Sequence, residues 1–260
     1  MQRLIKICFV GDVVGEPGRR MIRNVLPSFA SDNKADIVIV NGENAAHGLG
    51  ITARMCDEFF SCGVDVITLG NHAFSSFEFM SFIGKYDNVV RPGNVSSSWP
   101  GKAFTVVKGV GVANLMGQVQ MQPLCDTPFD EADEISRKFE EAGVKVTVYD
   151  FHAEATSEKQ AFGYYMDGRA SLVLGTHTHV MTADSRVLSG GTGYITDAGM
   201  TGCIDSVIGM NIGTSLKRLR EKLPARYEPA SGDAFMNGIL ADIDETSGKC
   251  IGIRRFTEYE

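Results

Sequence analysis

Short apolar runs recur along the chain, and each one ends abruptly at a polar residue or a glycine. The runs cover residues 4–10, 36–40, 64–69, 144–151, 171–175 and 193–196, and they are apolar at nearly every position rather than alternating. Runs of this kind, rich in β-branched residues, are typical of strands that are covered on both faces. We therefore predict that these segments are core strands.

Helical patterns separate the first of these strands. Pro17 to Phe29 begins with a proline suited to a first helical turn, and Thr52 to Cys62 opens on a threonine that can cap a helix. Strand, helix, strand is the order of parallel crossover units. Residues 104–115 and 234–259 instead predict antiparallel hairpins. The mixture predicts an α/β fold with two packed mixed sheets flanked by helices.

Three further segments do not fit the pattern of core strands. Phe74 to Pro100 and Pro123 to Gly143 are expected to be helix and loop, and residues 131–143 have the pattern of an exposed amphipathic helix. Gly202 to Ser231 has mixed charge and little periodicity. The chain shows no internal repeat and no low-complexity linker, so we expect residues 1–260 to form a single domain.

The composition narrows the classes of function. The 260 residues carry a formal net charge of -7 with 43% hydrophobic residues, and the sequence pI is near 5.3. This balance argues against general nucleic-acid binding, because such proteins usually display a basic face. A small anionic substrate would then need a local positive centre, for which a metal ion is the obvious choice.

The cysteines and the amino terminus bear on the cellular location. Six cysteines are scattered without CxxC spacing, a pattern that suits reduced thiols rather than a disulfide framework. The first ten residues are interrupted by Lys6 and lack the features of a signal peptide. No run approaches the roughly 18 apolar residues of a membrane span. We expect a cytoplasmic protein that does not enter the membrane.

Histidines gather at the predicted strand ends. Four of the five histidines, His72, His152, His177 and His179, lie at or just beyond the end of a core strand, where ligands of open α/β sheets collect. In an extended GTHTH segment both histidines would project to the same side, whereas a tight turn could direct them to neighbouring metals. Imidazole, carboxylate and amide groups suit Zn, Mn or Fe, and the absence of cysteine disfavours a structural zinc site.

Each of these residues also has an ordinary structural explanation. A strand-end aspartate such as Asp12 is more often a cap or a turn former. Asn71 and His72 follow a glycine and could form a turn, and His152 could be a satisfied core residue. The series nevertheless supplies Asp, Glu-Asn, Asn-His, His and HxH at five successive strand ends. This order favours a metal site over five unrelated turns.

The order of these motifs resembles that of the calcineurin-like metallophosphoesterases, whose usual motifs are DxH, GDxxD, GNH(D/E), H and GHxH. Within that superfamily the chain is similar from end to end to the YmdB-type branch. The matching stretches are GDVVGEPGRR, NGENAAHG, GNHAF, DFHAEATSEK, GTHTHV and YITDAGMTG. The resemblance implies a four-layer αββα sandwich and a metal-dependent phosphoesterase.

Two positions depart from the wider superfamily. Val14 stands where the first-motif histidine is expected, and Glu43 stands where a bridging aspartate is expected. The YmdB-type pattern implies that Asn44 supplies the missing ligand and that Glu43 bridges both ions. The implied ligands are Asp12, Glu43, Asn44 and His179 for one metal, and Glu43, Asn71, His152 and His177 for the other. His72 is then left free of metal as the proton donor.

The resemblance also implies a reaction and a substrate. Two metals can activate a bridging hydroxide for attack on phosphorus while His72 protonates the leaving alkoxide. The branch is similar to phosphodiesterases of 2',3'-cyclic nucleotides. A phosphomonoesterase and a metal-binding regulatory protein remain alternatives, whereas a Ser-His-Asp hydrolase is disfavoured because no GxSxG elbow is present. The sequence leaves the metal (Fe, Mn or Zn) and the oligomeric state open, and a homo-oligomer is one option.

Some residues near the motifs have less certain roles. His47 could contact the substrate but is more typical of a solvated loop. Asp150, Glu154 and Asp197 are candidates for orienting histidine rings, or else solvated turn residues. Gly199 to Gly202 resembles the family's loop at the rim of the site, and a plain glycine-flanked turn is the alternative.

Overall fold

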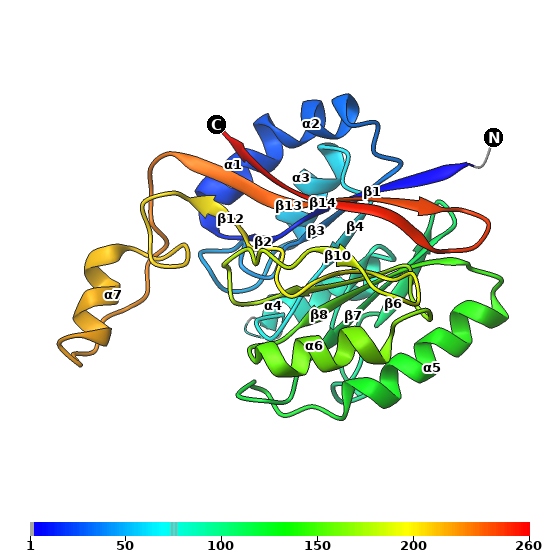
Figure 1. The fold of residues 1–260 in the computed structure, drawn as a ribbon. Coiled ribbons are helices and arrows are strands. Elements are labelled where there is room, and N and C mark those ends of the chain that lie inside the picture. The colour runs from blue at the N-terminus through cyan, green and yellow to red at the C-terminus, as the bar shows by residue number, and fades with distance from the viewer. Residues whose placement is uncertain (1–2, 74, 76) are drawn as a thin grey trace.

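The structure is a computed structural model that describes residues 3–73, 75 and 77–260. Phe74 of the GNHAF motif, Ser76 and the first two residues of the chain lie outside the described residues. The fold consists of two stacked β-sheets with helices on their outer faces (Figure 1). This arrangement confirms the α/β class and the two mixed sheets predicted from the sequence.

The first sheet has eight strands among the described residues. Its order is β2 (Asp12–Val13), β12 (Met200–Cys203), β13 (Ala234–Asp244), β1 (Leu4–Val10), β3 (Ile37–Asn41), β4 (Val66–Thr68) and β5 (Val89–Val90), with β14 (Cys250–Tyr259) paired to β13. Strands β1, β3, β4 and β5 run parallel, and β13 joins β1 antiparallel. The predicted crossover units and the carboxy-terminal hairpin are both present.

The second sheet has six strands in the described part of the chain. Its order is β10 (Arg186–Val187), β11 (Gly193–Ile195), β9 (Leu172–Thr176), β8 (Val146–His152), β7 (Val110–Met116) and β6 (Phe104–Val107). The central strands β7, β8, β9 and β11 are parallel, and β6 forms the predicted hairpin with β7. Lys108 and Gly109 both have positive φ at its turn, which suits a tight two-residue connection.

Helices cover the outer faces of both sheets (Figure 1). They are α1 (Gly15–Asn24), α2 (Leu26–Asp32), α3 (Ala53–Ser61), α4 (Phe77–Phe82), the short 3-10 turn η1 (Ile83–Lys85), α5 (Pro128–Glu141) and α6 (Thr156–Tyr165). Helix α7 (Ile212–Leu219) instead projects beyond the two sheets. Thr52 caps α3 by accepting a hydrogen bond from the Met55 amide, as its position predicted. None of the helices in the described residues combines the length and the apolar character needed to cross a bilayer.

Alternating side chains of the strands build the three larger apolar clusters among the described residues. In β1, Ile7 and Phe9 face the second sheet, whereas Cys8 and Val10 face the helices α1 to α3. A third cluster packs the outer face of the second sheet against α5 and α6. Because both faces of the central strands are covered, nearly every position along them is apolar. This burial explains why the runs do not alternate in the sequence.

The predicted helix from Pro17 to Phe29 is wrong in one respect. It is divided at Val25 into α1 and α2. Pro27 has no amide hydrogen, so it cannot donate to the carbonyl of Arg23 as a continuous helix would require. The chain therefore bends before Pro27 and begins a second helix.

Several short elements were not predicted. Strand β5 and helices α6 and α7 lie in segments without a clear period. Strand β12 overlaps Gly199 to Gly202, the stretch whose resemblance implies a loop at the rim of the site. Met200 pairs with Asp12 in parallel register, and the Asp12 amide donates to the Gly199 carbonyl. The segment thus positions the first motif by backbone pairing.

Candidate metal centre

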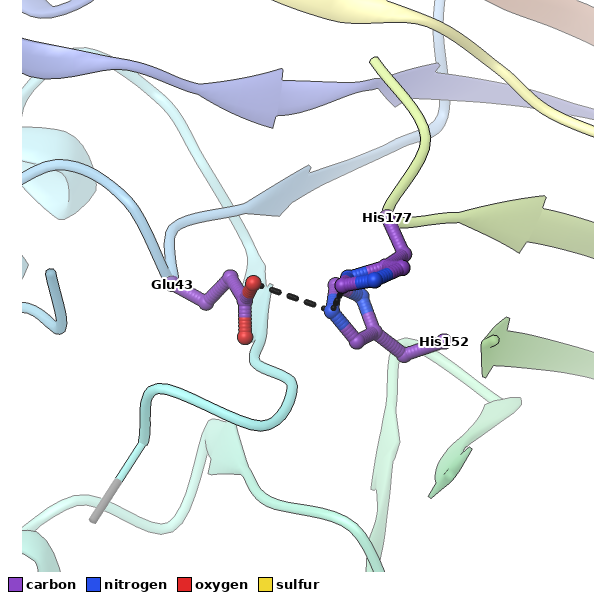
Figure 2. A group of neighbouring side chains, drawn as sticks. All are labelled: Glu43, His152 and His177. Carbon is purple, nitrogen blue, oxygen red and sulfur yellow. Dashed lines mark hydrogen bonds and ion pairs between the residues drawn. The ribbon is translucent and has the colours of Figure 1, made fainter. Parts of the chain in front are cut away.

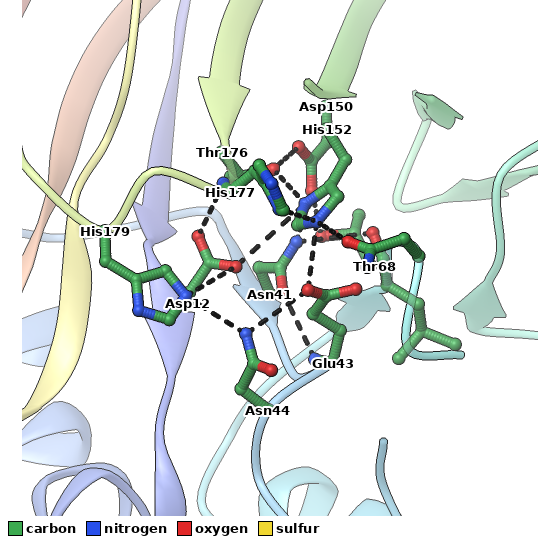
Figure 3. Close-up of polar contacts among 12 residues, drawn as sticks. Asp12, Asn41, Glu43, Asn44, Thr68, Asp150, His152, Thr176, His177 and His179 are labelled. Atoms are coloured by element: carbon green, nitrogen blue, oxygen red, sulfur yellow. Dashed lines mark hydrogen bonds and ion pairs between the residues drawn. The ribbon is translucent and has the colours of Figure 1, made fainter. Parts of the chain in front are cut away.

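Polar residues from both sheets meet where the parallel strands end. Asp12 follows β1, Glu43 and Asn44 follow β3, and Asn71 and His72 follow β4, whereas His152 ends β8 and His177 and His179 follow β9. Because the carboxyl ends of parallel strands share one edge of a sheet, residues far apart in sequence come together. The contacts among the residues drawn in Figure 3 form one continuous network. All eight predicted residues lie at this place.

One group of atoms converges on the ring of His152. Its Nε2 lies 2.9 Å from Glu43 Oε1, 3.0 Å from Asn71 Oδ1 and 3.1 Å from His177 Nδ1. Glu43, His152 and His177 can each offer a ligand atom, and these atoms all lie within 4.8 Å of one another (Figure 2). Nitrogen and oxygen atoms gathered in this way are suited to a divalent transition metal.

A second group lies on the other side of Glu43. The Asn44 amide nitrogen is 3.2 Å from Glu43 Oε1 and 3.1 Å from His179 Nε2. His179 Nε2 is in turn 3.8 Å from Asp12 Oδ1. Glu43 therefore lies between the two groups, which is where a bridging ligand has to be.

Two observations test whether a cation fits here. Asp12 is fully buried, and although its Oδ2 accepts the His177 amide at 3.2 Å, its Oδ1 has no hydrogen-bond partner in the part of the chain that the structure describes. A buried carboxylate oxygen without a partner is costly unless a cation neutralises it. Gly70 lies against the same group, and a Cβ atom there would collide with the Glu43 carboxylate and the His152 ring. The residues fit a bound metal.

Three of the histidines, His152, His177 and His179, each use one ring nitrogen to contact a residue outside the candidate metal centre. His152 Nδ1 contacts the Thr176 hydroxyl at 2.8 Å, His177 Nε2 contacts Glu154 at 3.1 Å, and His179 Nδ1 contacts the Ile208 carbonyl at 2.8 Å. When one nitrogen donates outward, the other presents its lone pair inward. The arrangement fixes the tautomer that a metal requires.

A series of buried hydrogen bonds connects His152 to Asp150. The Thr176 hydroxyl donates to Asp150 Oδ1 at 2.7 Å and can accept from His152. Asp150 also accepts from Thr68 and from Asn41. The expectation that Asp150 orients a histidine is thus met through Thr176 rather than by direct contact.

The GTHTH segment forms a tight turn rather than an extended strand. His177 and His179 have φ values of 101° and 67°, in the left-handed region that non-glycine residues rarely adopt. Asp197 holds the turn, because it accepts from the Thr178 amide at 3.1 Å and from the Thr178 hydroxyl at 2.7 Å. The predicted role of Asp197 as an acceptor for a histidine ring is therefore wrong.

The charge of Asp197 is balanced by a buried lysine. Lys159 of α6 donates to the Asp197 carboxylate at 2.6 Å, and both side chains are almost completely buried. Sequence reasoning missed Lys159, since a lone lysine in a helical stretch is usually solvated. It also missed Thr176 and Ile208, which act on the histidines only through tertiary packing.

The titratable groups are strongly coupled. Burial favours the neutral ring of His152, but the carboxylates of Glu43 and Asp12 outweigh it and raise the pKa of His152 to about 9. Burial and the nearby His152 lower the pKa of His177 to about 3. Burial opposes ionisation of Glu43, yet His152 and His72 hold its pKa well below the usual range. A cation that binds these atoms has to displace the His152 proton.

Comparison with known proteins agrees with this geometry. A family model described as YmdB-like protein matches residues 8–256. The chain belongs to the YmdB-like family. It is 46% identical over 258 residues to a 2',3'-cyclic-nucleotide 2'-phosphodiesterase of Bacillus subtilis, with 96% of each protein covered.

Two solved structures have the fold of this YmdB-like chain. A crystal structure of a novel phosphatase from Mycoplasma pneumoniae matches with a TM-score of 0.93 and 33% identity, covering 100% of this chain and 95% of that one. A crystal structure of a hypothetical protein from Thermus thermophilus matches with a TM-score of 0.90 and 39% identity, covering 98% of this chain and 100% of that one. The chain is a phosphoesterase hydrolase.

The close approach at Gly70 generates a test of the metal centre. We expect Gly70→Ala to bind less metal than the unchanged protein, because its methyl group takes the space between Glu43 and His152. Gly84→Ala is the matched control, since a Cβ atom at Gly84 meets nothing within 4 Å. Elemental analysis of both purified variants, with circular dichroism to verify folding, makes the comparison. Equal metal content in two folded variants would contradict the assignment.

Proposed function

We propose that this protein is a two-metal phosphodiesterase that hydrolyses 2',3'-cyclic nucleotides. One observation supports the proposal. Two groups of nitrogen and oxygen atoms lie on either side of Glu43, and they lie beside Asp12 Oδ1, which has no hydrogen-bond partner among the described residues. Both sheets contribute to the site, so we further propose that residues 1–260 act as one domain.

The two groups correspond to two ligand sets. Asp12, Glu43, Asn44 and His179 hold one metal, whereas Glu43, Asn71, His152 and His177 hold the other. Fe, Mn and Zn all suit these ligands. Bound cations supply the Lewis acidity that activates water and neutralises phosphoryl oxygens. They also replace the basic patch that a chain with a net charge of -7 lacks.

Asn44 has a double role in this scheme. Its Nδ2 faces Glu43 and His179, and its Oδ1 accepts from His72 Nδ1 at 2.8 Å. A half-turn of the amide exchanges the nearly isosteric oxygen and nitrogen. The oxygen then faces the metal site, and the nitrogen donates to His72 Nδ1. His72 thereby keeps its remaining proton on Nε2, where a leaving group can take it.

His72 is the proton donor in this proposal. Its amide donates to Glu43 Oε2 at 3.1 Å, its side chain is 31% exposed, and it lines the pocket above the metal centre. Hydrolysis joins the oxygen of water to phosphorus and breaks the bond to the ribose 2'-oxygen, which leaves as an alkoxide in need of a proton. Donation from an imidazole suits this step near neutral pH.

The substrate class can be tested by comparing two related nucleotides. We expect faster turnover of 2',3'-cyclic AMP than of adenosine 3'-monophosphate, with the 3'-monophosphate as the accumulating product. Chromatography of reactions run with the metal that copurifies follows both compounds, and a chelator should abolish turnover. Faster release of phosphate from the monophosphate would favour a phosphomonoesterase instead.

The ligand role of Asn44 predicts a change in metal stoichiometry. We expect Asn44→Ala to lose one of two metal equivalents, whereas Asn44→Asp keeps both because a carboxylate oxygen replaces the amide oxygen. His47→Ala, which alters an exposed residue of the same loop, serves as the control. Metal analysis by mass spectrometry provides the measurement. Full stoichiometry in Asn44→Ala would remove Asn44 from the ligand set.

The donor role of His72 predicts a dependence on the leaving group. General acid catalysis contributes about 100- to 10,000-fold, so His72→Ala should lose about 100-fold or more on a cyclic nucleotide. On bis(4-nitrophenyl) phosphate, whose leaving group needs no proton, the loss should be below about 10-fold. Steady-state kinetics on both substrates decide the matter, and equal losses would rule out His72 as the acid.

A further inference from the structure

A pocket of about 490 Å³ opens directly onto the metal centre. One side of it is formed by Glu43, Asn44, His72, His177 and His179. The volume lies within the range of pockets that bind whole small molecules, about 300 to 1,000 Å³. The pocket therefore has room for much more than the phosphate group that the metal centre requires.

The pocket also has apolar lining residues. Among them are Leu49, Ile208, Met210, Leu219 and Tyr227, and we call these five residues the apolar wall. Four of them, all but Met210, are each between 45% and 58% exposed. Apolar side chains that stay exposed beside a catalytic centre usually contact a ligand. Leu219 belongs to α7, which projects beyond the two sheets in Figure 1.

The apolar wall is attached to the metal centre itself. The carbonyl of Ile208 contacts the outer nitrogen of His179 at 2.8 Å, and Ile208 has a φ of 48°, which is unusual for a β-branched residue. Gly209 packs so closely on buried Val14 that a Cβ atom would collide with it. The turn that carries Ile208 and Met210 therefore rests on Val14, the residue that stands where the wider superfamily is expected to have a metal-binding histidine.

Tyr227 is the aromatic member of the apolar wall, and its ring is held in place. The guanidinium of Arg218 lies over the ring, 4.1 Å from the centroid, and donates to the Ala225 carbonyl at 2.7 Å. Arg218 covers one face of the ring, and Tyr227 lines the pocket. An aromatic ring held in this way is a suitable platform for a second flat ring.

We propose that the apolar wall is a subsite for the nucleobase, with Tyr227 as its stacking platform. The proposal rests on the proposed function, because it places the phosphate at the metal centre and the base against the wall. Stacking and apolar contact depend little on the hydrogen-bonding edge of a base. The subsite therefore accepts purines and pyrimidines alike and distinguishes nucleotides from phosphate esters that lack a base.

The test compares two five-membered cyclic phosphates, one with and one without a base. The substrates are 2',3'-cyclic AMP and glycerol 1,2-cyclic phosphate, and the measured quantity is the ratio of their kcat/KM values. Stacking on one aromatic side chain is worth about 1–3 kcal/mol per base, so Tyr227→Ala should lower this ratio by about 5- to 150-fold. Tyr227→Phe keeps the ring and should keep the ratio.

Tyr164→Ala is the matched control. Tyr164 on α6 is 60% exposed and lies beneath Arg186 with a ring distance of 6.0 Å, but it is not part of the pocket. This variant should leave both substrates unaffected. A ratio that Tyr227→Ala leaves unchanged, with both substrates slowed together, would overturn the proposal. The proposal would also be overturned if Tyr227→Ala left the ratio unchanged and light scattering showed that the variant had dissociated from an oligomer. In that case the apolar wall would be an interface between copies of the chain.

A binding measurement separates this proposal from the proposed function. Calorimetry with adenosine 3'-monophosphate and glycerol 2-phosphate reports on the subsite without turnover. If the unchanged protein hydrolyses no cyclic nucleotide, the proposed function is wrong. The subsite is then still supported if Tyr227→Ala weakens binding of the nucleotide by about 5-fold or more relative to glycerol 2-phosphate, and it is overturned if both bind as before.

Discussion

The burial of negative charge at the junction of the two sheets governs the rest of the structure. Asp12 and Glu43 are completely buried, and one oxygen of Asp12 has no hydrogen-bond partner among the described residues. Such carboxylates are tolerated only beside positive charge. Without a metal, the two carboxylates raise the pKa of His152 to about 9, so that its imidazolium supplies part of this charge. In the proposed enzyme, bound cations would replace that proton and balance the carboxylates. Burying these two carboxylates costs free energy of folding, and this cost favours a functional role for the strand ends where they lie.

The surrounding polar residues keep the ligands in the required orientation. Thr176 fixes the tautomer of His152, and Asp197, balanced by Lys159, holds the turn that carries His177 and His179. Strained φ values at the two histidines persist because these contacts determine the turn. On the side of the pocket, buried Val14 supports the turn that carries Ile208 and Met210 of the apolar wall.

Much of the fold and of the candidate site could be predicted from local sequence. Strands covered on both faces are apolar at nearly every position, so their positions could be predicted from the sequence. Residues just beyond a strand end must then lie at the edge of a sheet. For this reason every predicted site residue, from Asp12 to His179, lies at the junction. One exception also has a local origin, since Pro27 interrupts a helix that periodicity alone would continue.

The tertiary structure decided which residues that are distant in sequence contact one another. The sequence determined which strands form and which side chains stand at their ends, because these follow from short-range periodicity. It could not determine that Lys159 pairs with Asp197, that Ile208 holds His179, or that Gly209 rests on Val14. Each of these pairs joins residues that are far apart in the chain, and no local pattern records which partner a buried polar group will meet. The same holds for the four members of the apolar wall that lie between Gly202 and Ser231, a stretch with little periodicity. The role that we propose for them depends on their lining the same pocket as the candidate metal centre.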